Sequence, residues 1–176
     1  MIRFLVTAAP LVLCSLIPAE VTAQQQPGPE ERLREMGLSL PTASPPVGNY
    51  VRAVRSGNLV FLSGHGECSE PLRGKVGRDV TLEQAYDSAR NTGLCLLATL
   101  KGAIGDLAKV SRIVKVLGMV NSVETFTDQP KVINGFSDLM VAVFGERGRH
   151  ARSAVGMAAL PNNITVEIEM VVEILP

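Results

Sequence analysis

The C-terminal part of the chain has the clearest alternation of apolar and polar residues. From 166 to 173, one set of alternate positions is apolar, and the other carries mostly glutamates: Val166, Ile168, Met170 and Val172 against Glu167, Glu169, Val171 and Glu173. A period of two is typical of a strand with one buried face. We therefore expect a strand here, preceded by a turn at 161–163 and by a second apolar strand that begins at Arg152.

Two longer segments have helical spacing. Thr81 and Gln84 match a capping box, and apolar residues then recur every three or four positions up to Gly105, which predicts a long helix. A second helix is expected to begin around Asp128-Gln129-Pro130 and to end at Gly145.

The remaining apolar runs predict strands. A hairpin is expected from strands 50–54 and 59–63 joined by the turn 55–58, and 110–120 reads as a central strand covered by helices. The glycine-rich segment 64–79 is predicted to be a binding loop. The resulting order ββαβαββ indicates an α+β domain with two long helices on one face of a mixed sheet.

The first 46 residues differ from the rest. Arg3, an apolar run to Ile17, and small residues before Gln24 predict a signal peptide over 1–23, hence a periplasmic or secreted protein. An uncleaved anchor is the alternative, although the run is shorter than a membrane span. We expect 24–46 to be a polar, proline-rich tether with a short helix at 30–36, and 47–176 to be the folded domain.

The charge balance argues against two classes of partner. The chain has 17 basic and 17 acidic residues, so its net charge gives no attraction toward nucleic acid or toward an anionic membrane after signal cleavage. Two cysteines, Cys68 and Cys95, would remain in the mature chain, and an oxidising compartment permits them to pair. Because Cys95 lies in an apolar helical run, we interpret it as a buried, inert thiol rather than a disulfide partner. His65, Cys68 and His150 are too few and too scattered to predict a metal site.

Arg152 is the strongest candidate for binding chemistry. It begins a run of small and apolar residues, where a partly desolvated guanidinium would bind carboxylates. The sequence therefore predicts an anchor for a small acid.

Several motifs together resemble the RidA/YjgF family of reactive-intermediate deaminases, some of whose members are described as L-PSP endoribonucleases. They are Arg152-Ser153, Leu160-Pro161, Glu167-Ile168-Glu169, Tyr50 before the hairpin, and Ser63-Gly64 at its end. The match runs from about 49 to 175. The resemblance implies a chorismate-mutase-like fold, a homotrimer with clefts between subunits, and chemistry without a metal or cofactor.

The resemblance also implies roles for individual residues. Arg152 would bind the substrate carboxylate and Glu167 would position or deprotonate water, while the expected substrate-binding residues are Tyr50, Ser63, Gly64, Asn134 and Ala154. Ala154 stands where many active members have a cysteine. The competing interpretations are an exposed strand carboxylate for Glu167, an interface core residue for Tyr50, a strand-end cap for Ser63 and a surface amide for Asn134.

Three functions follow from these expectations. The first is hydrolysis of amino-acid enamines or imines, such as 2-aminoacrylate, to 2-keto acids and ammonia. The alternative is a non-catalytic trimer that captures small carboxylates in the periplasm. A ribonuclease is disfavoured by the balanced charge and the predicted export.

Overall fold

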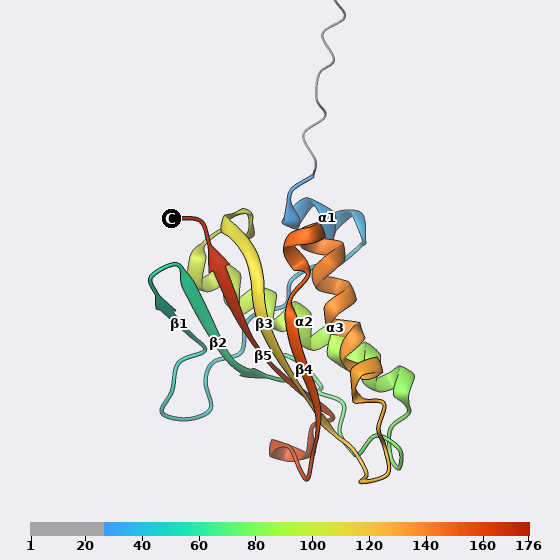
Figure 1. Cartoon of the computed structure of the whole chain (residues 1–176). Helices are drawn as coiled ribbons and strands as arrows, with labels where there is room; N and C mark the ends of the chain where they lie inside the picture. The colour runs from blue at the N-terminus through green and yellow to red at the C-terminus, as the bar shows by residue number, and fades with distance from the viewer. Residues whose placement is uncertain (1–26) are drawn as a thin grey trace, which may run out of the picture.

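The structure, a computed structural model, describes residues 27–176 and has the expected order of elements (Figure 1). A short helix comes first, α1 (Pro29–Glu35), and the ββαβαββ series follows: β1 (Ala53–Ser56), β2 (Leu59–His65), α2 (Leu82–Ile104), β3 (Val110–Asn121), α3 (Gln129–Phe144), β4 (Ala151–Met157) and β5 (Val166–Ile174). The fold is α+β, as predicted from the alternation of short apolar runs with helical spacing.

The five strands form one mixed sheet in the order β1-β2-β5-β3-β4. Only β3 and β4 pair in parallel, and they are connected through α3, whereas the other neighbours are antiparallel. β4 is therefore an edge strand, which carries Arg152 at one margin of the sheet (Figure 1).

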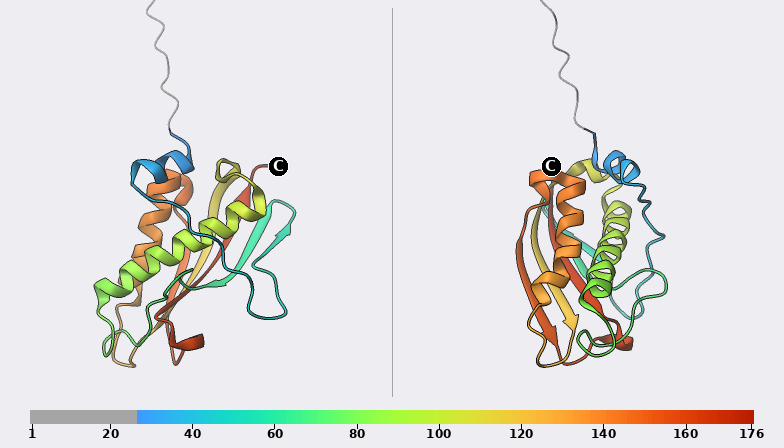
Figure 2. Two further views of the ribbon diagram at one scale, coloured as in Figure 1. Left: turned by 180° about the vertical axis from the view of Figure 1, so that it is seen from behind. Right: turned by 90° about the vertical axis from the view of Figure 1, so that its right-hand side faces the viewer.

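Helices α2 and α3 cover the same face of the sheet and pack against each other (Figure 2). The alternate residues of β5 predicted to be apolar, from Val166 to Val172, are all buried beneath these helices. Within residues 27–176, no helix covers the opposite face. It exposes Val54, Phe61 and Val155 together with the glutamates of β5, and we refer to it as the open face.

Local signals set the helix ends. The Thr81 hydroxyl accepts a hydrogen bond from the Gln84 amide and the Gln84 side chain accepts one from the Thr81 amide, so the capping box is complete. Gly105 and Gly145 end α2 and α3 with positive φ, as expected at helix C-termini.

The first hairpin differs from the prediction at both ends. β1 begins at Ala53 rather than Tyr50, although the Ser63 amide still donates to the Arg52 carbonyl just outside it. β2 continues to His65, and its pairing with β5 shifts between Leu62 and His65. This irregularity places an extra residue at Ser63-Gly64, where bulges commonly redirect side chains.

The residues before β1 are partly packed on the domain. The predicted short helix is present as α1, and its Leu33 is buried in the core while Glu30 pairs with Lys101 of α2 at 2.7 Å. The predicted signal peptide at 1–23 and the start of the predicted tether lie outside the described residues. Within residues 27–176, none of the helices has the length and apolar character needed to cross a membrane.

Candidate functional site

Arg152 lies on the helix-covered face of the sheet, where its side chain crosses to α3. Its Nη1 donates to Asn134 Oδ1 at 2.9 Å and to Ser137 Oγ at 3.0 Å, and its Nη2 donates to the Pro130 carbonyl at 3.4 Å. Within the described part of the chain, Arg152 has no carboxylate partner. The guanidinium is therefore partly buried and oriented by neutral groups, which leaves its charge for an external anion.

Two other predicted residues adjoin Arg152. Asn134, on the second turn of α3, accepts one of its hydrogen bonds, so the structure brings these two together. Ala154 is two residues further along β4, opposite Gly118, and packs against the core on the same face. His150, just before β4, contacts Ser137 at 3.0 Å. We define Asn134, Ser137, His150 and Arg152 as the Arg152 cluster.

Glu167 lies on the open face of β5, opposite Met119. It is half-buried over Gly64, and a Cβ added at Gly64 would overlap with Glu167 Oε1. Burial raises the pKa of Glu167, the neighbouring Glu169 raises it further, and Arg52 partly offsets both. A carboxylate whose pKa is raised in this way is better suited to accept a proton than an exposed one.

Tyr50, Ser63 and Gly64 each lie next to Arg52. Arg52 Nη1 donates to the Gly64 carbonyl at 3.4 Å, and its guanidinium carbon lies 6.0 Å from the centroid of the Tyr50 ring. Ser63 Oγ donates to the Val51 carbonyl at 2.8 Å. We define Tyr50, Arg52, Ser63, Gly64 and Glu167 as the Glu167 cluster.

The two clusters lie on opposite faces of the sheet in a single chain. On β3, Val116 is paired with Arg152 and Met119 with Glu167, and the register between these two positions is regular. Paired residues point to the same face of a sheet, whereas residues three apart on one strand point to opposite faces. Contacts agree with this, because Arg152 reaches α3 whereas Glu169, which shares the face of Glu167, lines a hollow of about 240 Å³ on the open face. The structure therefore does not bring Arg152 and Glu167 together within one chain.

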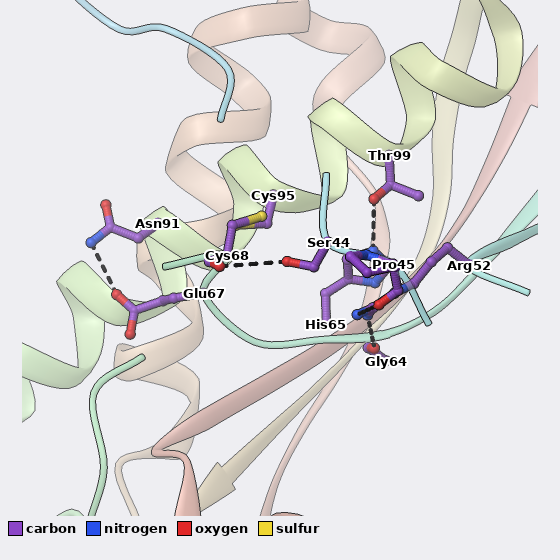
Figure 3. The surroundings of a disulfide bond; sticks show 10 residues. All are labelled: Ser44, Pro45, Arg52, Gly64, His65, Glu67, Cys68, Asn91, Cys95 and Thr99. Carbon is purple, nitrogen blue, oxygen red and sulfur yellow. Dashed lines mark hydrogen bonds between the residues drawn. A yellow bond between two sulfur atoms is a disulfide. The ribbon is translucent and has the colours of Figure 1, made fainter. Parts of the chain in front are cut away.

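The loop that follows β2 is fixed to α2 by a disulfide (Figure 3). Cys68 of the loop is joined to Cys95 of α2, with their Cα atoms 5.7 Å apart. The interpretation of Cys95 as an inert thiol was therefore wrong. Its apolar surroundings do predict burial, but sequence alone does not show that the loop returns to this turn of α2.

Polar contacts hold the same loop against α2 (Figure 3). Glu67 accepts hydrogen bonds from two residues of α2, from Ser88 Oγ at 3.0 Å and, as Figure 3 shows, from Asn91 Nδ2 at 3.1 Å. The buried His65 ring contacts Thr99 Oγ1 at 2.8 Å and the Ser63 carbonyl at 2.6 Å. These contacts fix the backbone at Gly64, and with it the surface on which Glu167 lies.

Three residues that sequence reasoning missed belong to the clusters: Arg52, Ser137 and His150. Each had a signal in the spacing. Arg52 follows Tyr50 by two residues, Ser137 follows Asn134 by three in a helix, and His150 precedes Arg152 by two. The spacing places Ser137 on the same side of α3 as Asn134, whereas Arg52 and His150 are near predicted site residues in sequence but lie just outside β1 and β4.

A further hollow lies elsewhere and contains none of the predicted site residues. Its volume is about 900 Å³, and it is lined by residues that include Lys75, Phe126, Gln129 and Met157. Lys75 Nζ already donates to Asn121 Oδ1 at 2.8 Å and to the Ala158 carbonyl at 2.7 Å. The Lys75 ammonium group thus already has hydrogen-bond partners that connect neighbouring segments, and we do not assign this hollow a ligand.

Comparisons with known proteins agree with the fold. Residues 30–174 match the family model described as "YjgF/chorismate_mutase-like, putative endoribonuclease". Protein TCP17 of Trypanosoma cruzi is 41% identical over 81% of this chain and 91% of its own length. A 2-iminobutanoate/2-iminopropanoate deaminase of Dermatophagoides farinae is 32% identical over 78% of this chain and 94% of its own length. The crystal structure of Atu1372 from Agrobacterium tumefaciens, a protein of unknown function, matches this fold with a TM-score of 0.78 and 46% sequence identity. The match covers 84% of this chain and 92% of Atu1372.

Proposed function

Because the chain belongs to the RidA/YjgF family, which includes an imine deaminase, we propose that it hydrolyses enamines or imines of amino acids to 2-keto acids and ammonia. The reaction takes place in a cleft between subunits of a homotrimer. The observation that carries the proposal is Arg152, a partly buried guanidinium on an edge strand that is held by neutral groups and has no carboxylate partner in residues 27–176.

Arg152 binds the carboxylate of the substrate. A guanidinium can form two parallel hydrogen bonds with a carboxylate, which fixes the orientation of a small molecule as well as its position. In an imine of an amino acid, the carboxylate is attached directly to the carbon of the C=N bond. Fixing the carboxylate therefore also fixes the electrophilic carbon relative to the protein.

Glu167 acts as the general base. It removes a proton from a water molecule as the oxygen attacks the imine carbon, and this proton passes to the nitrogen, which gives a carbinolamine and the ionised carboxylate again. Glu167 then moves the hydroxyl proton of the carbinolamine to the amine nitrogen as the C=O bond forms, so the C–N bond breaks and ammonia leaves. The raised pKa of Glu167, caused first by burial, supports this role because it increases the proton affinity of the carboxylate.

The proposal requires more than one chain, since Arg152 and Glu167 lie on opposite faces of the sheet. A head-to-tail contact that places the Arg152 edge of one copy against the open face of the next closes into a ring when the rotation permits. Val54, Phe61 and Val155 are 53%, 44% and 40% exposed on that face, and their burial would stabilise the contact.

The test uses imines generated in solution from L-amino acids by an amino-acid oxidase. We expect the protein to accelerate release of ammonia and keto acid, and Arg152→Ala and Glu167→Gln each to abolish the acceleration. Two variants serve as matched controls. Arg149→Ala removes an arginine whose partner is the exposed Glu146, and Glu173→Gln alters another glutamate of β5, and both should retain full activity. Full activity of Arg152→Ala would exclude the mechanism.

Capture of carboxylates without turnover is the second candidate, and the separation of Arg152 from Glu167 within a chain favours it. Calorimetric titration with pyruvate distinguishes the two. Binding that depends on Arg152, without any acceleration of ammonia release, would identify a binding protein rather than a hydrolase.

We also propose that the protein is exported to the periplasm or secreted. The Cys68–Cys95 disulfide supports this, because structural disulfides persist in oxidising compartments. N-terminal sequencing of the protein recovered from the periplasmic or secreted fraction of expressing cells should begin at Gln24. Recovery of the intact chain from the cytoplasm alone would contradict this proposal.

A further inference from the structure

Arg152 is the end of a chain of hydrogen bonds that runs through Ser137 to the partly buried ring of His150. Ser137 Oγ lies 3.0 Å from Arg152 Nη1 and 3.0 Å from His150 Nε2. On its other side, His150 Nδ1 lies 2.7 Å from the Gly148 carbonyl. The ring also packs edge-on against Phe136, with centroids 5.9 Å apart, so it has little freedom to turn.

The chemistry of the end groups fixes the direction of every bond in this chain. The Gly148 carbonyl can only accept, so Nδ1 of His150 carries the hydrogen and Nε2 of the neutral ring is an acceptor. The Ser137 hydroxyl then donates to Nε2, which leaves its lone pairs to accept from Arg152. Burial is the main cause that lowers the pKa of His150, which keeps the ring in this neutral form.

This arrangement uses both hydrogens of Nη1 and one of the two hydrogens of Nη2, which leaves Nε and the second Nη2 hydrogen for a ligand. Both hydrogens of Arg152 Nη1 are used, by Asn134 Oδ1 and by Ser137 Oγ. The third contact, from Nη2 to the Pro130 carbonyl, is longer at 3.4 Å. The donors on the Nε–Nη2 edge point the same way, and such an edge matches the two oxygens of a carboxylate.

We propose that Ser137 and His150 are positioning residues, which orient Arg152 so that its Nε–Nη2 edge faces the carboxylate of the substrate. This inference rests on the proposed function, because it assigns Arg152 to carboxylate binding. It deepens that function by explaining how a flexible side chain on an edge strand is fixed before substrate arrives. Substrate binding then does not include the entropic cost of ordering the arginine side chain, so the affinity is higher.

The experiment compares variants that keep or remove a single bond in the chain. Ser137→Ala removes the hydroxyl, whereas Ser137→Thr keeps it. His150→Gln keeps an acceptor at the Nε2 position, whereas His150→Asn keeps only a group near Nδ1. The measurements are KM and kcat for imine hydrolysis and the Kd of pyruvate by calorimetry.

We expect Ser137→Ala and His150→Asn to raise KM and the pyruvate Kd about tenfold or more, since each weakens a bond to a charged group. The kcat should change less than about threefold, because neither residue touches the reacting atoms. Ser137→Thr and His150→Gln should restore values close to wild type. A role in packing alone would not produce this split between the paired variants.

Two results would overturn the inference while leaving the proposed function intact. One is an active wild-type protein whose KM and pyruvate Kd do not change in Ser137→Ala. The other is an equal effect of His150→Gln and His150→Asn, which decides the question even where Ser137→Ala fails to fold. A wild-type protein that neither hydrolyses imines nor binds pyruvate would overturn the proposed function itself, and the inference with it.

Discussion

At the scale of single residues, the protonation of Glu167 controls the proposed reaction. A general base works only when ionised, and burial together with Glu169 raises the pKa of Glu167 above the 4.5 of an ordinary glutamate. We therefore expect kcat/KM to fall as pH decreases through this raised pKa and to reach a plateau above it. A pH–rate profile of the wild-type protein measures the midpoint.

Two neighbouring variants should move that midpoint in opposite directions. Arg52→Gln removes the cation that lowers the pKa of Glu167, so its profile should shift to higher pH. Glu169→Gln removes the anion that raises the pKa, so its profile should shift to lower pH. A midpoint that stays fixed in both variants would show that another group controls the rate.

Gly64 provides a second prediction at this scale. A methyl group at Gly64 would occupy the position of Glu167 Oε1, and the end of that flexible side chain has to move. We expect Gly64→Ala to lower kcat roughly ten- to a hundredfold, as for a displaced catalytic group, with little loss of thermal stability. Gly102→Ala is the matched control, because a Cβ there meets nothing within 4 Å and alanine favours the helix. Wild-type activity in Gly64→Ala would exclude a positional requirement for Glu167.

The sequence pattern identified the candidate residues Arg152 and Glu167, but it did not identify Ser137 and His150, which hold Arg152 through hydrogen bonds. Arg152 stands out because it begins an apolar run, and Glu167 because it interrupts an apolar alternation. His150 and Ser137 carry no such contrast. Their contact with Arg152 depends on how α3 crosses β4, which is set by packing of the core rather than by local pattern.

At the scale of elements, the loop between β2 and α2 depends on its covalent link to the helix. The Cys68–Cys95 bond closes a loop with a sequence separation of 27, and a link of this size contributes about 2–4 kcal/mol. We expect reduction by dithiothreitol to lower the free energy of unfolding by that amount in urea titrations. Hydrogen exchange should increase in residues 66–71, next to the broken bond, where the remaining side-chain ties are polar contacts such as Glu67 to Ser88. It should stay low at Val76, which is buried in the core and joined to the backbone of 121–123.

The variant in which Cys68 and Cys95 are both alanine is the control for this prediction. It should be less stable than the oxidised protein and should not respond to dithiothreitol. If the wild-type protein unfolds at the same urea concentration with and without the reductant, the bond has no stabilising role.

Elements with strong end signals were predictable from sequence, and those without them were not. The capping box at Thr81 and the glycines at 105 and 145 mark helix ends through local hydrogen bonding, so the predicted and observed helices agree closely. β1 has no such signal. Its start at Ala53 and the extension of β2 to His65 follow from the irregular pairing at Ser63-Gly64, which depends on β5.

At the scale of the whole molecule, the fold separates Arg152 and Glu167, the two groups proposed to cooperate in catalysis. The sheet order places Arg152 on an edge strand and Glu167 two strands away on the opposite face. No rearrangement within the sheet could join them without reversing the strand faces, which would bury Glu167 and expose Ile168. A neighbouring copy therefore has to supply one of the two groups if both act on one substrate.

Mixing two inactive variants tests this directly. In a ring of copies, each site takes Arg152 from one subunit and Glu167 from the next. When Arg152→Ala and Glu167→Gln chains are unfolded together and refolded at equal amounts, about a quarter of the sites pair an intact Arg152 with an intact Glu167 by random assembly. We expect about a quarter of wild-type activity in the mixture, none in either variant alone, and a trimeric mass by light scattering. Activity absent from a mixture that forms trimers would place both groups in one subunit's site, or exclude one of them from the reaction.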